Sequence, residues 1–84
     1  MLYKKAVMQM PETIGDRIRK VRINAGMSQR KFARSVYVAR STVCRWEKGK
    51  SVPYAHDVQH IAELCGVSCD YLILGKCANI GANT

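Results

Sequence analysis

Glycine and proline divide the chain into short segments, and this division constrains the fold more than any other feature of the sequence. Gly26, Gly49 and Gly66 each follow a segment whose apolar residues have helical spacing, and Pro53 marks a loop. No segment shows the two-residue alternation of a half-buried strand. A chain of 84 residues has room for one small domain. The sequence therefore predicts an all-α domain of five short helices.

Start signals and apolar stripes place these helices. Thr13 and Asp16 are typical of a capped helix start, and one apolar stripe follows as far as residue 25, formed by Ile14, Ile18, Val21 and Ala25. Ser28 and Ser68 are predicted to cap later helices. The further helices are predicted over residues 29–35, 39–48, 55–65 and from 69 to near 75. Residues 1–12 and 76–84 are predicted to be flexible tails on a domain that covers residues 13–75.

Charge is distributed unevenly along the chain. It has 14 Lys and Arg against 6 Asp and Glu, a net charge of +8. Residues 13–50 hold eleven of the basic side chains and two acidic ones, whereas residues 51–75 hold three acids and no Lys or Arg. This asymmetry favours a polyanion-binding face over a uniformly solvated surface. The 48% of hydrophobic residues is too many for a disordered polycation, and no apolar run approaches the length of a membrane span.

Residues 27–49 carry a specific pattern. Met27-Ser28-Gln29 is followed by Phe32-Ala33 and by the run Val38-Ala39-Arg40-Ser41-Thr42-Val43-Cys44-Arg45-Trp46-Glu47-Lys48-Gly49. This pattern resembles the helix-turn-helix of Xre/Cro-type DNA-binding proteins, which have the lambda-repressor-like fold. The resemblance extends over about residues 13–75, through Pro53, residues 61–68 and residues 70–72. It implies that the 39–48 helix enters the major groove of DNA.

The resemblance also implies roles for individual residues. Base-reading positions fall on Ala39, Arg40, Ser41 and Arg45. A helical wheel independently places Ser41, Arg45 and Lys48 opposite the inward residue Val43. Phosphate contacts are expected from residues that flank the two helices, namely Gln29, Arg30, Lys31, Lys48, Lys50 and Ser51.

Two charged residues are predicted to turn inward. On the helical wheel Arg22 lies near Ile18, and Glu47 lies near Val43. Because a lone buried charge is costly, the two are expected to form a structural ion pair, which the resemblance also implies.

The chain departs from the family pattern at three positions. Tyr37 occupies a turn position that usually holds glycine, so either Tyr37 has a positive φ and is mildly strained or the turn differs from that of the family. Ala39 replaces the usual hydroxyl cap of the second helix of the motif. Lys31 stands where an acid is common, a change that favours DNA affinity.

The cysteines and histidines do not predict a metal site or any cofactor. Cys65 falls on the inward face of its helix, as a small core residue, while His56 and His60 fall on the opposite, solvent-facing side. Cys44 is predicted to point outward near the DNA face, and a redox switch at this residue is a second hypothesis. Disulfides are not expected, because DNA binding implies a reducing cytoplasmic location.

Three classes of function follow. The first is a bacterial or phage-type transcriptional regulator, with repression as the expected action, which binds a pseudopalindromic operator as a homodimer. The exposed pair Ile73 and Leu74 is the predicted dimer surface. The alternative is an antitoxin that regulates its own operator and binds a toxin. An enzyme is not expected, because the sequence has no recognisable catalytic set.

Overall fold

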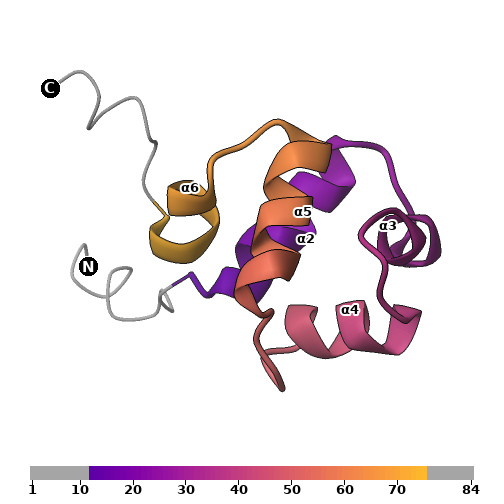
Figure 1. Ribbon diagram of the computed structural model, residues 1–84. Coiled ribbons are helices and arrows are strands. Elements are labelled where there is room, and N and C mark those ends of the chain that lie inside the picture. The colour runs from indigo at the N-terminus through magenta and orange to yellow at the C-terminus, as the bar shows by residue number, and fades with distance from the viewer. Residues whose placement is uncertain (1–11, 76–84) are drawn as a thin grey trace, which may run out of the picture.

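The computed structural model describes residues 12–75, and within this range it contains five helices and no strand (Figure 1). The predicted tails lie outside the described residues, apart from Glu12. The helices are α2 (Ile14–Asn24), α3 (Gln29–Ser35), α4 (Arg40–Glu47), α5 (Ala55–Cys65) and α6 (Cys69–Leu74). The prediction of an all-α domain with five short helices is confirmed. No helix in residues 12–75 has the length and apolar character needed to cross a membrane.

Helix α2 is the centre of the domain, since it packs against α4, α5 and α6, while α3 packs on α4. Figure 1 shows α3 and α6 at opposite ends of the molecule. The residues of the core come from all five helices and are Ile18, Val21, Phe32, Ala33, Val36, Val43, Trp46, Val58, Ile61, Ala62 and Leu72. The predicted stripe on the first helix is wrong at Ala25, which is exposed because α2 ends at Asn24.

Side-chain caps begin three of the helices as predicted. The backbone N–H of Asp16 donates to the Thr13 hydroxyl, and the N–H of Thr13 donates to the Asp16 carboxylate. Ser28 and Ser68 accept from the third residue of α3 and of α6. Helix α4 instead has Ala39 as its N-cap, which makes no side-chain hydrogen bond, so its first turn lacks the stabilisation that a hydroxyl would add.

The turn between α3 and α4 decides between the two alternatives that the sequence left open for Tyr37. Tyr37 has φ 65°, in the left-handed region that glycine occupies without cost. The backbone N–H of Val38 donates to the carbonyl of Ala33, which closes the turn across residue 37. The chain therefore keeps the turn geometry of the motif despite the substituted residue.

Gly15 lets α2 approach the end of α4 closely. A Cβ added at this position would overlap the carbonyl oxygen of Trp46 and press on the backbone of Glu47. The absence of a side chain at Gly15 thus sets the distance between the two helices. Sequence reasoning gave this glycine no role, because its position inside a helix carries no turn signal.

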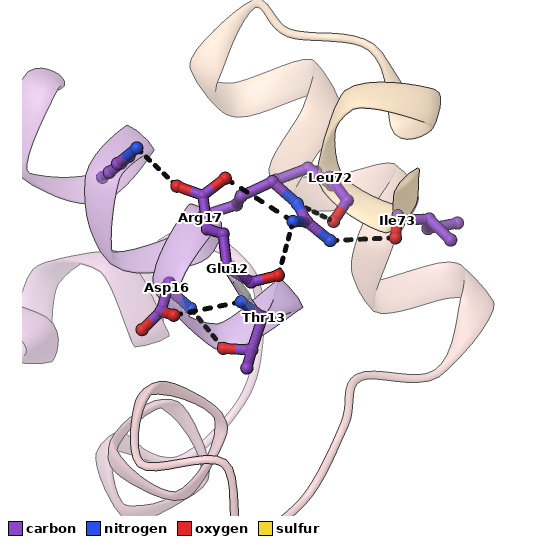
Figure 2. Close-up of polar contacts among 7 residues, drawn as sticks. Glu12, Thr13, Asp16, Arg17, Leu72 and Ile73 are labelled. Atoms are coloured by element: carbon purple, nitrogen blue, oxygen red, sulfur yellow. Dashed lines mark hydrogen bonds and ion pairs between the residues drawn. The ribbon is translucent and has the colours of Figure 1, made fainter. Parts of the chain in front are cut away.

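Arg17 fastens the other side of α2 to α6, as Figure 2 shows. Its guanidinium is buried and donates to three backbone carbonyls, those of Leu72 at 2.8 Å, Ile73 at 2.9 Å and Glu12 at 3.1 Å. A cation at the carboxyl end of a helix also interacts favourably with the helix dipole.

The Glu12 side chain bonds Lys20, and this bond lowers the pKa of the Glu12 carboxyl. Glu12, which the sequence places in the N-terminal tail, therefore contacts the folded domain.

Candidate nucleic-acid interface

Helix α4 presents a polar face to solvent. Val43 and Trp46 are buried, whereas Arg40, Ser41 and Arg45 are exposed on the opposite side. The helix is one residue shorter at each end than the predicted 39–48, because Ala39 and Lys48 are its N-cap and C-cap. Both caps are exposed. All four predicted base-reading positions are thus open to solvent at the start and middle of α4.

The predicted phosphate-binding residues lie at the start of α3 and after α4. Arg30 and Lys31 are exposed on the first turn of α3, and Lys48 and Lys50 are exposed after α4. Ser51 and Gln29 are half-buried. The exposed side chains make a basic face, defined here as Arg30, Lys31, Arg40, Arg45, Lys48 and Lys50. Cationic side chains around a helix are what a phosphate backbone requires.

The structure brings Arg22 and Glu47 together behind this face. Arg22 Nε donates to Glu47 Oε2 at 2.7 Å, and Arg22 NH2 donates to Oε1 at 3.1 Å. The two side chains are only 12% and 6% exposed, so the pair lies in the interior. The third guanidinium nitrogen donates to the carbonyl of Met27 at 2.9 Å. An ion pair with two hydrogen bonds, in which the third guanidinium nitrogen also donates to a carbonyl, meets the condition under which burial of charge is tolerated.

Gln29 extends the ion pair to the surface. Its amide nitrogen donates to Glu47 Oε1 at 3.0 Å, and its amide oxygen accepts from Arg40 NH1 at 3.3 Å. Arg22, Glu47, Gln29 and Arg40 therefore form one hydrogen-bonded chain from α2 through α4 and α3 to the start of α4. Sequence reasoning missed the contacts of Gln29. They depend on the rotamers of the side chains involved, and the spacing of residues along the sequence does not determine rotamers.

The cysteines and histidines lie apart from this arrangement. Burial raises the pKa of the Cys65 thiol, which packs against the core, and Cys44 is half-buried rather than fully outward. His56 is exposed, but His60 is half-buried against Tyr37, so its predicted solvent-facing position is wrong. The ring of Tyr37, in the turn before α4, packs edge-on against the His60 ring on α5. Within residues 12–75, three or more metal-ligating side chains do not gather anywhere; Cys77 is outside this range.

Comparisons with known proteins place this geometry in a family. Residues 15–76 match the family model described as a helix-turn-helix domain. An uncharacterized HTH-type transcriptional regulator of Haemophilus influenzae is 44% identical over 45 residues, which are 54% of this chain and 19% of that protein. The SPbeta prophage-derived uncharacterized HTH-type transcriptional regulator YonR of Bacillus subtilis is 31% identical over 61 residues, 73% of this chain and 56% of YonR. The chain thus matches only part of the length of these curated relatives.

Solved structures agree on the fold. The P22 c2 repressor in complex with a synthetic operator superposes with a TM-score of 0.74 at 24% identity, over 79% of this chain and 100% of that chain. The N-terminal DNA-binding domain of SinR from Bacillus subtilis superposes with a TM-score of 0.68 at 25% identity, over 74% of this chain and 91% of that domain. The chain therefore belongs to the helix-turn-helix domain family, with the lambda-repressor-like fold.

Proposed function

We propose that this chain binds double-stranded DNA sequence-specifically and acts as a transcriptional regulator, with α4 in the major groove. The observation that carries the proposal is the exposed face of α4, with Arg40, Ser41 and Arg45 at its centre and basic side chains around it. The family match and the operator complex of the similar P22 c2 repressor support it. The proposal gives the chain no catalytic activity.

The residues of α4 have the chemistry needed to distinguish bases. A guanidinium can donate two hydrogen bonds to O6 and N7 of guanine, so Arg40 and Arg45 each fit one guanine. Ser41 can donate or accept at a base edge, and the methyl group of Ala39 fits beside the methyl group of thymine. These four contacts would set the operator sequence.

The remaining residues of the basic face would contact phosphates. Lys48, Lys50 and Ser51 follow α4, and Arg30 and Lys31 begin α3 together with Gln29, so they lie on both sides of the inserted helix. Such contacts set affinity and position without reading sequence, and they make binding strongly dependent on salt.

The hydrogen-bonded chain from Arg22 would hold Arg40 ready for its base. Because Gln29 is fixed by Glu47, the acceptor that Arg40 uses is itself held in place. An arginine that is already oriented loses less side-chain entropy on binding. The ion pair would then contribute to recognition without touching DNA.

Two copies are expected on an operator, since one small domain offers few base contacts. Half-sites about 34–36 Å apart would suit a two-fold dimer. Ile73 and Leu74 are exposed on α6 and remain the surface that the sequence suggests for contact between copies. Occupation of a promoter by such a dimer would repress transcription in the cytoplasm.

The test is selection of binding sites from random duplexes, followed by mobility shifts at two salt concentrations. We expect one motif and a steep loss of affinity with salt. Arg45→Ala should cost about 1–3 kcal/mol and relax one base position, whereas Lys48→Ala should weaken all sequences alike.

The matched control is Lys20→Ala, which removes the same charge from the part of α2 that pairs with Glu12. It should leave both affinity and motif unchanged. Weak binding without a motif, equally reduced by all three substitutions, would contradict the proposal and direct attention to a protein partner such as a toxin.

A further inference from the structure

The two arginines of α4 leave the helix on different flanks. Arg40 and Arg45 are five residues apart, so at about 100° per residue they are separated by about 140° around the helix axis. Ser41 falls between them, and Val43 and Trp46 occupy the buried side. The exposed face of α4 therefore has a guanidinium at each margin and a small hydroxyl side chain in the middle.

Contacts with the rest of the domain agree with this placement. Arg40 NH1 donates to the side chain of Gln29 on α3 at 3.3 Å. Arg45 instead lines a groove of about 420 Å³ together with Val52 and Tyr54, which lie between α4 and α5. Figure 1 shows α3 over the start of α4 and the segment to α5 at its other end. Arg40 thus lies on the flank toward α3, and Arg45 lies on the flank toward the segment that leads to α5.

The width of the major groove decides which strand each flank can reach. The groove of B-DNA is about 12 Å wide, and an α-helix with its side chains has a diameter of about 10–12 Å. An inserted α4 therefore fills the groove, and each flank faces the wall formed by one strand. The N7 of a guanine lies on the side of the groove nearer its own backbone, so a guanidinium meets a guanine of the strand that it faces.

The rise of the helix sets the separation of the two bases. Five residues advance about 7.5 Å along α4, at about 1.5 Å per residue. Base pairs are stacked about 3.4 Å apart, so this advance spans about two base pairs. The reach of the arginine side chains extends the separation to about three base pairs. Ser41 then faces a base pair between the two guanines.

We propose that Arg40 and Arg45 read guanines on opposite strands, about two or three base pairs apart. Each half-site then contains one guanine and one cytosine at this separation, whichever strand is read. Two guanines on one strand would leave one guanidinium beside a cytosine, whose N4 amino group is itself a donor. The inference rests on the proposed function, since it specifies which duplex α4 recognises.

Gln29 makes the two contacts unequal. Its amide nitrogen is bonded to Glu47, and its amide oxygen accepts from Arg40, so Gln29 is a positioning residue for one base only. Gln29→Ala removes this acceptor and leaves the direct bonds between Arg22 and Glu47 in place. Discrimination at the guanine that Arg40 reads should therefore fall, whereas discrimination at the guanine that Arg45 reads should stay as in the wild type.

Replacement of single guanines by 7-deazaguanine tests the strand assignment. This analogue lacks the N7 acceptor, and it can be placed on either strand of the duplex that the full 84-residue chain selects from random sequences. Each of the two replacements should lower the affinity of the wild type at least about threefold. Arg40→Ala should abolish the effect at one guanine, and Arg45→Ala should abolish it at the guanine of the other strand.

The matched control is Lys48→Ala, which removes a cation of the basic face that the proposal assigns to a phosphate. This variant should bind less tightly while both effects of 7-deazaguanine persist. Both arginines are exposed, so their alanine variants should fold, and circular dichroism checks that they do.

Several results would overturn the inference while the proposed function stands. They are a selected motif without the two guanines, both guanines on one strand, or a separation of about four base pairs or more. A 7-deazaguanine effect that both arginine variants abolish would also overturn it. If no motif is selected from random duplexes, the proposed function itself fails, and the inference fails with it.

Discussion

Two regions of the molecule are each fastened to α2 by one arginine, and the two arginines use different kinds of partner. Toward α4, Arg22 binds a side chain, the carboxylate of Glu47. Toward α6, Arg17 binds only backbone carbonyls apart from a longer 3.6 Å contact to Glu12. A charged side chain that turns inward predicts a partner of opposite charge, which can be recognised in the sequence. A backbone carbonyl cannot be recognised in this way, because every residue has one. The comparison explains why sequence reasoning anticipated the Arg22 pair and overlooked Arg17.

The largest effect is expected at Arg17. Arg17→Met should lower the free energy of unfolding by about 3 kcal/mol, because buried carbonyls of α6 would lose their charged donor. Urea denaturation followed by circular dichroism measures the loss. Arg17→Lys keeps the charge but offers one ammonium group to three carbonyls, so it should fall between methionine and the wild type. A loss below about 1 kcal/mol in Arg17→Met would show that water replaces the guanidinium.

At the Arg22–Glu47 pair, one substitution should lower the free energy of unfolding, and replacement of both residues should restore it. Glu47→Leu should cost about 2–3 kcal/mol, because it leaves a nearly buried guanidinium without its carboxylate. The double variant Arg22→Met/Glu47→Leu should return to within about 1 kcal/mol of the wild type. No second side chain can rescue Arg17→Met in this way. A double variant as unstable as Glu47→Leu alone would remove the distinction between the two regions.

A smaller gain is expected at the start of α4. Ala39→Ser should raise the free energy of unfolding by about 1 kcal/mol, since its hydroxyl can accept an N–H that now has no side-chain partner. Thermal denaturation measures the gain. Ser28→Ala at the start of α3 is the reverse control and should lose a similar amount. No change in either variant would show that these first turns are capped by water.

The smallest effect is a pH dependence at Asp16. Hydrogen bonds from Thr13 lower the pKa of the Asp16 carboxyl below its ordinary value. Its contribution to stability is therefore present above the pKa of the unfolded chain and is lost as pH falls through the folded-state pKa. Asp16→Asn should be less stable than the wild type near neutral pH, with a difference that shrinks in acid. Urea denaturation between pH 6 and 3 measures this difference in the free energy of unfolding. A difference that stayed constant over this range would contradict the prediction.

The sequence by itself determined the local structure and which residues of α4 face solvent. Glycine at the ends of helices, the caps Thr13, Ser28 and Ser68, and the apolar spacing placed all five helices to within about two residues. These signals act between residues three or four positions apart, so they can be read from the chain. The outward face of α4 follows from the same periodicity, whereas the φ of Tyr37 was left open by the sequence.

The tertiary structure alone decided how those elements touch. Gly15 admits the backbone of Trp46, Arg17 closes α6, Gln29 links Glu47 to Arg40, and Tyr37 meets His60. Each of these contacts joins a residue to an atom far away in the chain, and several of those atoms belong to the backbone. Spacing along the sequence shows which face a side chain occupies, but the atom it meets depends on how the helices pack.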